Sequence, residues 1–346
     1  MFDISLLMRC RNSEGSFLRY QLEQERKKIP FINNIETTNA CNMKCIMCPR
    51  TTKMTRPIET MSLDLFKKVA DQSPKNHYSS TWGAWKDYCK RHFGIEDNEM
   101  SENHFYLYVI SQAIILHGYG DPLLDTTIAE KIQYLTDKEI KSYFSCNPNN
   151  IQLDKTENIL KAGLNYLKYS IDSTDDNEMK EIRGKHSDFT VSFQKILEVA
   201  NLIEQKKYTT RLVLTMIETS EKSKEEFSIL KEKCEGLNCY IYLKSLNSVW
   251  EYNNNLKNKS IQWNEPCFFP WYSITIKSNG DCVSCGEDFN NEIVFGNANN
   301  ETLEEIWNSK KYTEFRLRHF IRNGYFGNDK LKCWKECDMH KFEEKV

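Results

Sequence analysis

Three cysteines near the N-terminus, Cys41, Cys45 and Cys48, have a spacing suited to binding iron. Three thiolates this close together can ligate three irons of a [4Fe–4S] cluster and leave the fourth iron without a protein ligand. An iron with an open position can bind and reduce a small molecule instead of only passing electrons. A structural zinc site is the main alternative. Zinc normally takes four protein ligands, however, and this run offers three without a nearby histidine.

Residues 36–50, which surround this run, resemble the signature of the radical S-adenosylmethionine (radical SAM) superfamily. In that family the open iron binds the amino and carboxylate groups of SAM, and reduction of the cluster yields a 5′-deoxyadenosyl radical that takes a hydrogen atom from the substrate. The residue before the third cysteine is usually aromatic and stacks near the adenine. Here it is Met47, an apolar side chain able to fill the same space.

A second motif, residues 118–122, follows a predicted strand at 112–117. It resembles the Gly-Gly-Glu-Pro motif of the family, although a lone Gly-x-Gly indicates an ordinary turn. Glycine lets the backbone approach a ligand closely, and the resemblance implies that backbone carbonyls here receive the SAM ammonium group. The predicted cofactor-binding residues are Gly118, Tyr119, Gly120 and Asp121.

A third motif combines residues 166–172 with residues 181–184. It resembles the region around the fourth strand of the family, where a serine and an arginine reach the SAM carboxylate and ribose. Ser170 and Arg183 occupy these positions. Arginine suits a carboxylate because its guanidinium donates two parallel hydrogen bonds. Without the other motifs, Arg183 would be interpreted as an arginine on a helix surface.

The elements that must position these motifs alternate between apolar strand-like runs and helical stretches. This order predicts an α/β fold, an open (β/α)6 partial TIM-like barrel of the kind that the resemblance implies. The three motifs follow the first, second and fourth strands, and ligands of parallel βα folds bind at the carboxyl ends of strands. The six strands are expected at 34–39, 112–117, 140–146, 165–171, 209–217 and 238–244.

We expect three parts in the chain: a lead-in over 1–32, the barrel over 33–250 and a small iron–sulfur domain over 260–346. A length of 346 residues suits a barrel with an appendage. An insertion at about 73–108 leaves the barrel near its active face. It is either a lid that contacts substrate or a helical hairpin packed on the outside. Its aromatic and histidine residues are Trp82, Trp85, Tyr88, His92, His104, Phe105 and Tyr106.

Two residue pairs resemble the boxes that begin helices. Asp154 with Glu157 predicts one helix start, and Thr302 with Glu305 predicts another. In such a box, each side chain bonds a backbone N–H that the first helical turn leaves without a partner.

A second set of cysteines lies near the C-terminus. Residues 280–285 contain the Gly-x4-Cys element of the SPASM domain, the auxiliary-cluster extension of many radical SAM enzymes, and residues 333–337 match its Cys-x3-Cys. Further cysteines that a two-cluster SPASM domain needs are missing, so the count fits the shortened "twitch" form with one auxiliary [4Fe–4S] cluster. Four thiolates would make that cluster an electron relay or store, and a structural zinc is the alternative. The resemblance implies as ligands Cys267, Cys285, Cys333 and Cys337.

Two cysteines outside these ligand sets, Cys282 and Cys146, are candidates for a catalytic role. Radical epimerases of the superfamily use such a thiol to donate a hydrogen atom to the substrate radical. Cys282 is also compatible with an ordinary half-buried thiol or with a ligand that replaces Cys285. The sequence does not choose between these roles.

Composition restricts the partners and the compartment. Lys and Arg total 47 against 49 Asp and Glu, a net charge of −2 with no basic tract. Neither nucleic acid nor a membrane is therefore an expected partner. No signal peptide or apolar stretch of transmembrane length is visible. Thirteen cysteines in tight clusters without an export signal favour metal ligation in a reducing cytoplasm over disulfides.

The sequence leaves three reactions open. The first is a dehydrogenase that oxidises an alcohol carbon of a sugar, cyclitol or similar small molecule and passes an electron to the auxiliary cluster. The second is a peptide or protein modification such as crosslinking, and the third is epimerisation. A flavodoxin- or ferredoxin-type protein is the expected electron donor. An electron carrier without a reaction of its own is disfavoured by the SAM motifs. Oxidation needs a general base, for which the candidates are Lys244, Tyr242, Glu218 and Asp172.

Overall fold

The computed structural model describes residues 21–74, 80–92, 94–97, 99–246 and 269–320. The strands are β1 (Phe31–Ile35), β2 (Ile114–Ile115), β3 (Ser142–Cys146), β4 (Tyr166–Ser170), β5 (Arg211–Glu218), β6 (Cys239–Ser245), β7 (Ser273–Ile276), β8 (Asp281–Val283) and β9 (Val294–Asn297). The α-helices are α3 (Leu63–Ala70), α4 (Ser80–His92), α5 (Glu102–His104), α6 (Ile128–Asp137), α7 (Leu153–Lys161), α8 (Asp176–Arg183), α9 (Phe189–Lys206), α10 (Ser223–Lys233), α11 (Phe269–Tyr272), α12 (Leu303–Asn308) and α13 (Lys310–Phe320). Short helical turns are η1 (Pro49–Thr51), η2 (Phe105–Val109, a π-helix), η3 (Pro122–Leu124) and η4 (Pro148–Asn150).

The strands form one sheet in the order β6-β5-β4-β3-β2-β1-β7-β8-β9. The first six strands are parallel and lie beside their neighbours in sequence, which is the predicted partial barrel. β7 adds a parallel strand to the free edge of β1, and the C-terminal unit continues from there as an antiparallel meander. The barrel and the C-terminal unit therefore share one sheet.

All six predicted strands of the barrel are present, but the first one lies earlier than predicted. β1 ends at Ile35, whereas residues 36–39 follow the strand and turn toward the cysteines. The polar Asn34 belongs to the strand because its side chain donates to the carbonyls of Ile115 and His117 at 3.1 and 2.5 Å. An asparagine in this position hides the strand from a search for apolar runs.

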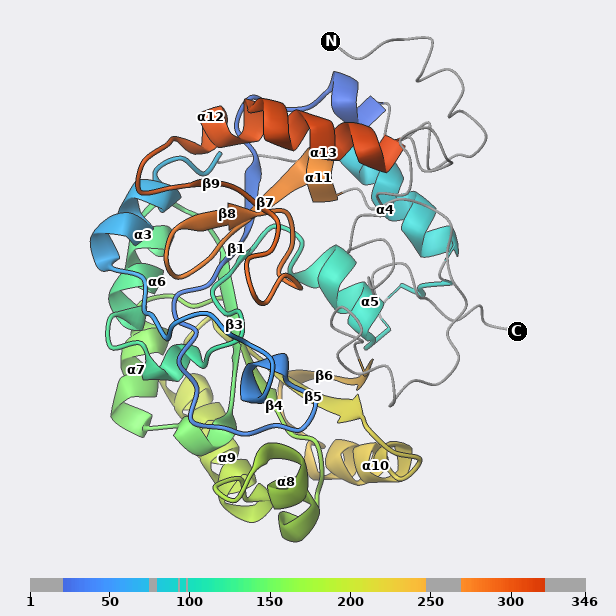
Figure 1. Cartoon of the computed structure of the whole chain (residues 1–346). Coiled ribbons are helices and arrows are strands. Elements are labelled where there is room, and N and C mark those ends of the chain that lie inside the picture. The colour runs from blue at the N-terminus through green and yellow to red at the C-terminus, as the bar shows by residue number, and fades with distance from the viewer. Residues whose placement is uncertain (1–20, 75–79, 93, 98, 247–268, 321–346) are drawn as a thin grey trace.

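Successive residues of each strand face opposite sides of the sheet. On β4, Leu167 and Tyr169 belong to the main apolar core, which lies between the sheet and the helices. Figure 1 shows α3, α6 and α7 along that side. Lys168 and Ser170 point to the other side, the inner face of the barrel, because they alternate with these core residues.

The insertion covers part of the inner face instead of packing outside the barrel. α5 lies across the sheet from α6 and α7 (Figure 1). Phe105, at the start of η2, is fully buried against Tyr143, Tyr240 and Tyr242. Of the two alternatives for the insertion, the outer hairpin is therefore wrong for this part of it. The side chains of Trp82, Trp85 and His92 lie outside the described residues.

Of the two predicted capping boxes, one is confirmed. The Thr302 hydroxyl accepts from the Glu305 N–H at 3.2 Å, and the Glu305 carboxylate accepts from the Thr302 N–H at 2.8 Å. The other is wrong because α7 begins at Leu153 after Gln152, which makes no side-chain cap. Asp154 lies inside the first turn, where a negative charge still favours the positive end of the helix dipole.

None of the helices in the described part of the chain has the length and apolar character needed to cross a membrane.

Candidate active site

The three N-terminal cysteines lie in a loop between β1 and η1 that the end of α8 holds in place. The N–H of Lys44 donates to the carbonyl of Arg183 at 3.1 Å, and the N–H of Ile46 donates to that of Ile182 at 2.9 Å. The last carbonyls of a helix have no partner within it, so this loop satisfies them. The first and third motifs are thereby joined.

The thiols of this loop are partly exposed. The N–H of Met43 donates to the sulfur of Cys41 at 3.4 Å, and a guanidinium nitrogen of Arg183 lies 3.9 Å from the sulfur of Cys45. Burial raises the pKa of all three thiols, that of Cys48 to about 12. Metal binding must therefore displace protons, because the thiolate is the ligand.

The arrangement fits an iron–sulfur cluster by its donor set: three thiols from one loop, with N–H and guanidinium donors beside the sulfurs. Within the described ranges, no group of three or more His, Cys, Asp or Glu residues is placed around a single metal ion. Met47, between the second and third cysteines, is buried. Its predicted contact with adenine stays a prediction.

Arg183 forms an ion pair with Asp172, with 2.5 Å between Nη2 and Oδ2. The pair links the end of α8 to the segment after β4 and places the guanidinium beside Cys45. The Ser170 hydroxyl, at the end of β4, lies 3.3 Å from the hydroxyl of Ser145 on β3. The structure thus brings Ser170 and Arg183 to the same end of the sheet as the cysteines, where the resemblance places SAM.

The two glycines of the second motif pack against the segment after β1. A Cβ added to Gly120 would lie 2.2 Å from the carbonyl oxygen of Thr38, and one added to Gly118 would lie 2.5 Å from Oε1 of Glu36. Only glycine fits such contacts. Both positions are therefore explained by close packing, and their contact with SAM stays a prediction.

Asp121 has a structural role in this conformation. One carboxylate oxygen accepts from the N–H of Leu123 at 2.9 Å. The other accepts from the N–H of Asn147 at 3.1 Å and the side chain of Asn150 at 2.7 Å. Both oxygens are thus engaged within the protein. Asp121 ties the second motif to the segment after β3.

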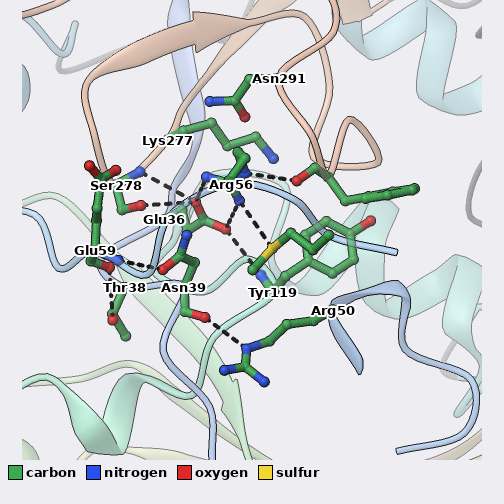
Figure 2. A network of polar contacts seen from close by, with 12 residues as sticks. Glu36, Thr38, Asn39, Arg50, Arg56, Glu59, Tyr119, Lys277, Ser278 and Asn291 are labelled. Atoms are coloured by element: carbon green, nitrogen blue, oxygen red, sulfur yellow. Dashed lines mark hydrogen bonds and ion pairs between the residues drawn. The ribbon is translucent and has the colours of Figure 1, made fainter. Parts of the chain in front are cut away.

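A buried polar network centred on Glu36 joins the barrel to the C-terminal unit (Figure 2). Arg56 donates two hydrogen bonds of 2.9 Å to the Glu36 carboxylate and a third, of 2.7 Å, to the carbonyl of Phe289. Ser278 and Tyr119 add backbone N–H donors at 3.3 and 3.2 Å. Burial favours the neutral acid, but Lys277 and Arg56 outweigh it and hold the pKa of Glu36 below its usual value.

No motif of the sequence predicts this network, because its members lie far apart in the chain. The one local signal is the polar Glu36 directly after an apolar strand, which marks a buried acid in need of partners.

Tyr119, at the second position of the Gly-Gly-Glu-Pro-like motif, reaches into the C-terminal unit. Its hydroxyl donates to the carbonyl of Glu287 at 3.3 Å, and its ring packs edge-on against Phe289. Burial raises the pKa of Tyr119 well above its usual value, and the negative charge of Glu287 adds to this rise. Its phenol thus contacts the loop that carries Cys285.

Of the predicted auxiliary ligands, Cys285 is partly exposed, and its sulfur accepts from the N–H of Glu287 at 3.4 Å. Cys267, Cys333 and Cys337 lie outside the described residues. The auxiliary site is therefore described only at Cys285.

The two thiols considered as hydrogen-atom donors both face the apolar core. Cys282, on β8, is fully buried, and its S–H donates to the carbonyl of Gly280 at 3.6 Å. Cys146 ends β3 on the helix side of the sheet, with its sulfur 3.7 Å from the carbonyl of Lys168. Neither thiol lies on the inner face of the barrel, so we do not propose a catalytic role for them.

Comparison with known proteins identifies two families in this chain. Residues 35–227 match the radical SAM superfamily, and residues 267–338 match the SPASM iron–sulfur cluster-binding domain. The first match spans more than half of the chain, so the protein belongs to the radical SAM superfamily. Members of this superfamily use SAM with a [4Fe–4S] cluster, and the SPASM domain carries additional iron–sulfur centres.

Among curated proteins, the chain is similar to the S-adenosyl-L-methionine-dependent 2-deoxy-scyllo-inosamine dehydrogenase of Niallia circulans, with 32% identity over 75 residues. That match covers 22% of this chain and 28% of the relative.

Two solved structures have a similar fold. BtrN in complex with AdoMet and 2-DOIA is 16% identical, with a TM-score of 0.50 over 86% of this chain and 89% of that one. SuiB of Streptococcus suis bound to its precursor peptide SuiA is 14% identical, with a TM-score of 0.51 over 88% and 71% of the two chains. At these identities, the similarity supports the fold alone.

Proposed function

We propose that this protein oxidises an alcohol carbon of a small hydroxylated molecule, such as a sugar or cyclitol, to a ketone. Cys41, Cys45 and Cys48 would hold the SAM-binding cluster, and Cys285 with Cys267, Cys333 and Cys337 one auxiliary cluster. When bound, these groups supply a 5′-deoxyadenosyl radical that takes a hydrogen atom and an acceptor for one electron. The protein must add a base for the hydroxyl proton and exclude water.

The observation that carries this proposal is the position of Tyr119. Its phenol donates to the carbonyl of Glu287, and the N–H of Glu287 donates to the sulfur of Cys285. An auxiliary cluster on Cys285 would thus adjoin the active end of the barrel, where it can accept an electron from a substrate radical. A cluster with a purely structural role has no need of this position.

The inner face of the barrel supports a small substrate. Phe105 and the rest of η2 already cover the inner side of β3, β5 and β6. A substrate must fit beside this segment, which favours a compact molecule over an extended peptide. The similarity to the 2-deoxy-scyllo-inosamine dehydrogenase of Niallia circulans, whose name denotes a small cyclic substrate, also favours a compact molecule.

The four bases considered from the sequence differ in their contacts. Asp172 is paired with Arg183, and Glu218 with Lys224 at 3.5 Å. Lys244 pairs with Glu102, and although burial opposes it, the negative charge of Glu102 raises the pKa of Lys244. Burial raises the pKa of Tyr242. Asp172 and Glu218 are thus held in ion pairs, whereas Lys244 and Tyr242 hold their protons more strongly than usual.

To test the proposal, the protein would be reconstituted without oxygen and incubated with SAM, dithionite and separate neutral, acidic and amino sugars and cyclitols. Ketone would be trapped with a hydrazine and compared with 5′-deoxyadenosine release. We expect one ketone per 5′-deoxyadenosine with at least one substrate. Release stimulated only by peptides would reject the proposal in favour of peptide modification. Inversion at carbon without ketone would indicate epimerisation.

A further inference from the structure

The inner face of the barrel carries a lysine that lacks a carboxylate partner. Lys168 is only 5% exposed and forms no ion pair within the described part of the chain. Its ammonium lies 5.8 to 6.0 Å from the ring centres of Tyr106, Tyr143 and Tyr242. The rings offset only part of the cost of burying a cation.

A second lysine makes this region more positive. The ammonium of Lys244 lies 5.9 Å from the same Tyr106 ring and 3.0 Å from a carboxylate oxygen of Glu102. Of the two ammonium groups, only that of Lys244 contacts a carboxylate among the described residues. The next acid, Glu287, acts on Lys244 more weakly than Glu102 does. The side chain of Lys244 remains 16% exposed.

The region also holds a hydroxyl that could donate to a ligand. Tyr242 is fully buried, and its hydroxyl has no hydrogen-bond partner among the described residues. Burying such a group is unfavourable unless a ligand supplies the partner.

The pKa of Tyr106 reflects the positive charge of the two lysines. Burial would raise its pKa, but Lys168 and Lys244 outweigh burial and lower it.

Lys168, Tyr106 and Tyr242 lie on the inner face of the barrel, further from the carboxyl ends of the strands than the predicted SAM contacts. Ser170 is the next residue on the inner face of β4 after Lys168, about 6 to 7 Å further along the strand. Ser170 bonds Ser145, whose N–H donates to Nδ1 of His117 at 3.1 Å. A molecule bound at Lys168 would therefore extend toward the end of the sheet where the cysteines lie.

We infer that Lys168, with the hydroxyls of Tyr106 and Tyr242, binds an anionic group of the substrate, a carboxylate or a phosphate. This inference rests on the proposed function and narrows it to acidic sugars or cyclitols, such as a uronic acid or a sugar phosphate. The anion supplies the negatively charged partner that Lys168 lacks among the described residues and accepts from the Tyr242 hydroxyl. An amino-cyclitol, which the name of the Niallia circulans relative denotes, would carry a cation that both lysines repel.

The test measures binding to the reconstituted protein with SAM, by calorimetry without oxygen or reductant, so that no radical forms. The probes are D-glucuronate, D-glucose 6-phosphate, D-glucose and D-glucosamine, which share one ring and differ in charge. We expect at least one of the two acids to bind ten-fold or more tightly than glucose, and glucosamine to bind most weakly. The tighter acid distinguishes a carboxylate ligand from a phosphate. Equal affinities, or a preference for glucosamine, would overturn the inference.

Two substitutions test whether the preference for acids depends on Lys168 and Tyr242. Lys168→Met should reduce the affinity for the acids to that for glucose, whereas Lys206→Met, at the exposed end of α9, should change nothing. Tyr242→Phe should weaken acid binding and leave glucose binding unchanged, which provides a second readout if Lys168→Met does not fold. Retention of the preference in both variants would place the anion elsewhere and refute the inference.

Failure of the inference and failure of the proposed function give different results. A preference for acids that Lys168→Met removes, without ketone formation from any sugar, would reject the oxidation alone. Ketone formation from neutral or amino sugars, without a preference for acids, would reject the anion site alone.

Discussion

The hydroxyl of Tyr119 donates a hydrogen bond to the backbone carbonyl of Glu287 at 3.3 Å. This bond joins the motif after β2 to the loop that carries Cys285. The ion pair of Glu36 and Arg56 lies beside it and holds the same two parts of the chain together. Buried, bonded groups thus connect the barrel to the loop that carries Cys285.

Glu36→Gln should destabilise the protein, because it leaves the Arg56 guanidinium buried without a charged partner. Breaking a buried pair costs about 3–5 kcal/mol. Urea unfolding at pH 7.5 would measure this loss against Glu232→Gln, a variant of an exposed residue that should stay within about 0.5 kcal/mol of the wild type. Equal stability of both variants would contradict the structural role of Glu36.

The same comparison should depend on pH. The pKa of Glu36 is lower in the folded protein than its ordinary value of 4.5. Its stabilising contribution is therefore complete above that value and lost as the pH falls through the folded pKa. The difference in unfolding free energy between the wild type and Glu36→Gln should be constant from pH 8 to about 5.5 and shrink below about 4.5. A difference that grows on acidification would show that the folded pKa is raised.

Gly120→Ala should disrupt the second motif. Its Cβ would meet the backbone carbonyl of Thr38 at 2.2 Å, and backbone cannot move as a side-chain end can. Overpacking of this kind costs about 1–3 kcal/mol or more. Gly286→Ala is the control, since a Cβ there meets nothing within 4 Å. We expect a lower melting temperature and weaker SAM binding for Gly120→Ala only. Equal melting temperatures would show that the close approach is absent in solution.

Cys285→Ala and Cys282→Ala distinguish a ligand from a core residue three positions away. The sulfur of Cys285 is partly exposed, whereas that of Cys282 faces the apolar core. Cys285→Ala should lower the iron content by about four per chain, keep SAM cleavage and stop ketone formation. Cys282→Ala should keep all the iron. Ketone formation by Cys285→Ala would show that the auxiliary cluster is not the electron acceptor.

Cys45→Ala should remove the SAM-binding cluster and abolish 5′-deoxyadenosine release, because two remaining thiolates cannot hold a cube with one open iron. Iron per chain should fall by about four, and the electron paramagnetic resonance signal that changes on adding SAM should disappear. Retained cleavage of SAM would contradict the assignment of this loop.

The parallel strands and the three motifs could be predicted because each depends on a local pattern. An apolar run followed by glycine or a polar pair marks both a strand and the residues at its carboxyl end, whereas the asparagines of β1 shifted the predicted bounds of that strand. Contacts between distant segments leave no such pattern. The partners of Glu36 come from residues 56, 119, 277 and 278, and none of them shows its role in its own surroundings.

The side of the sheet that Cys146 faces follows from the alternation of side chains along β3. Cys146 pairs with Tyr169 across β3 and β4, and both face the helices. Lys168, between Tyr169 and Leu167, must then face inward. Only the pairing register of β3 with β4 shows which way Cys146 faces. The sequence of β3 alone (Ser142–Cys146) does not show which of its faces is covered by helices.

Reconstitution of the wild type without oxygen tests most directly whether this chain is a two-cluster radical enzyme. Iron and sulfide per chain would be measured together with 5′-deoxyadenosine release under dithionite. We expect about eight irons and release of 5′-deoxyadenosine. Absence of release would contradict the SAM chemistry. Release with about four irons would remove the electron acceptor that alcohol oxidation requires.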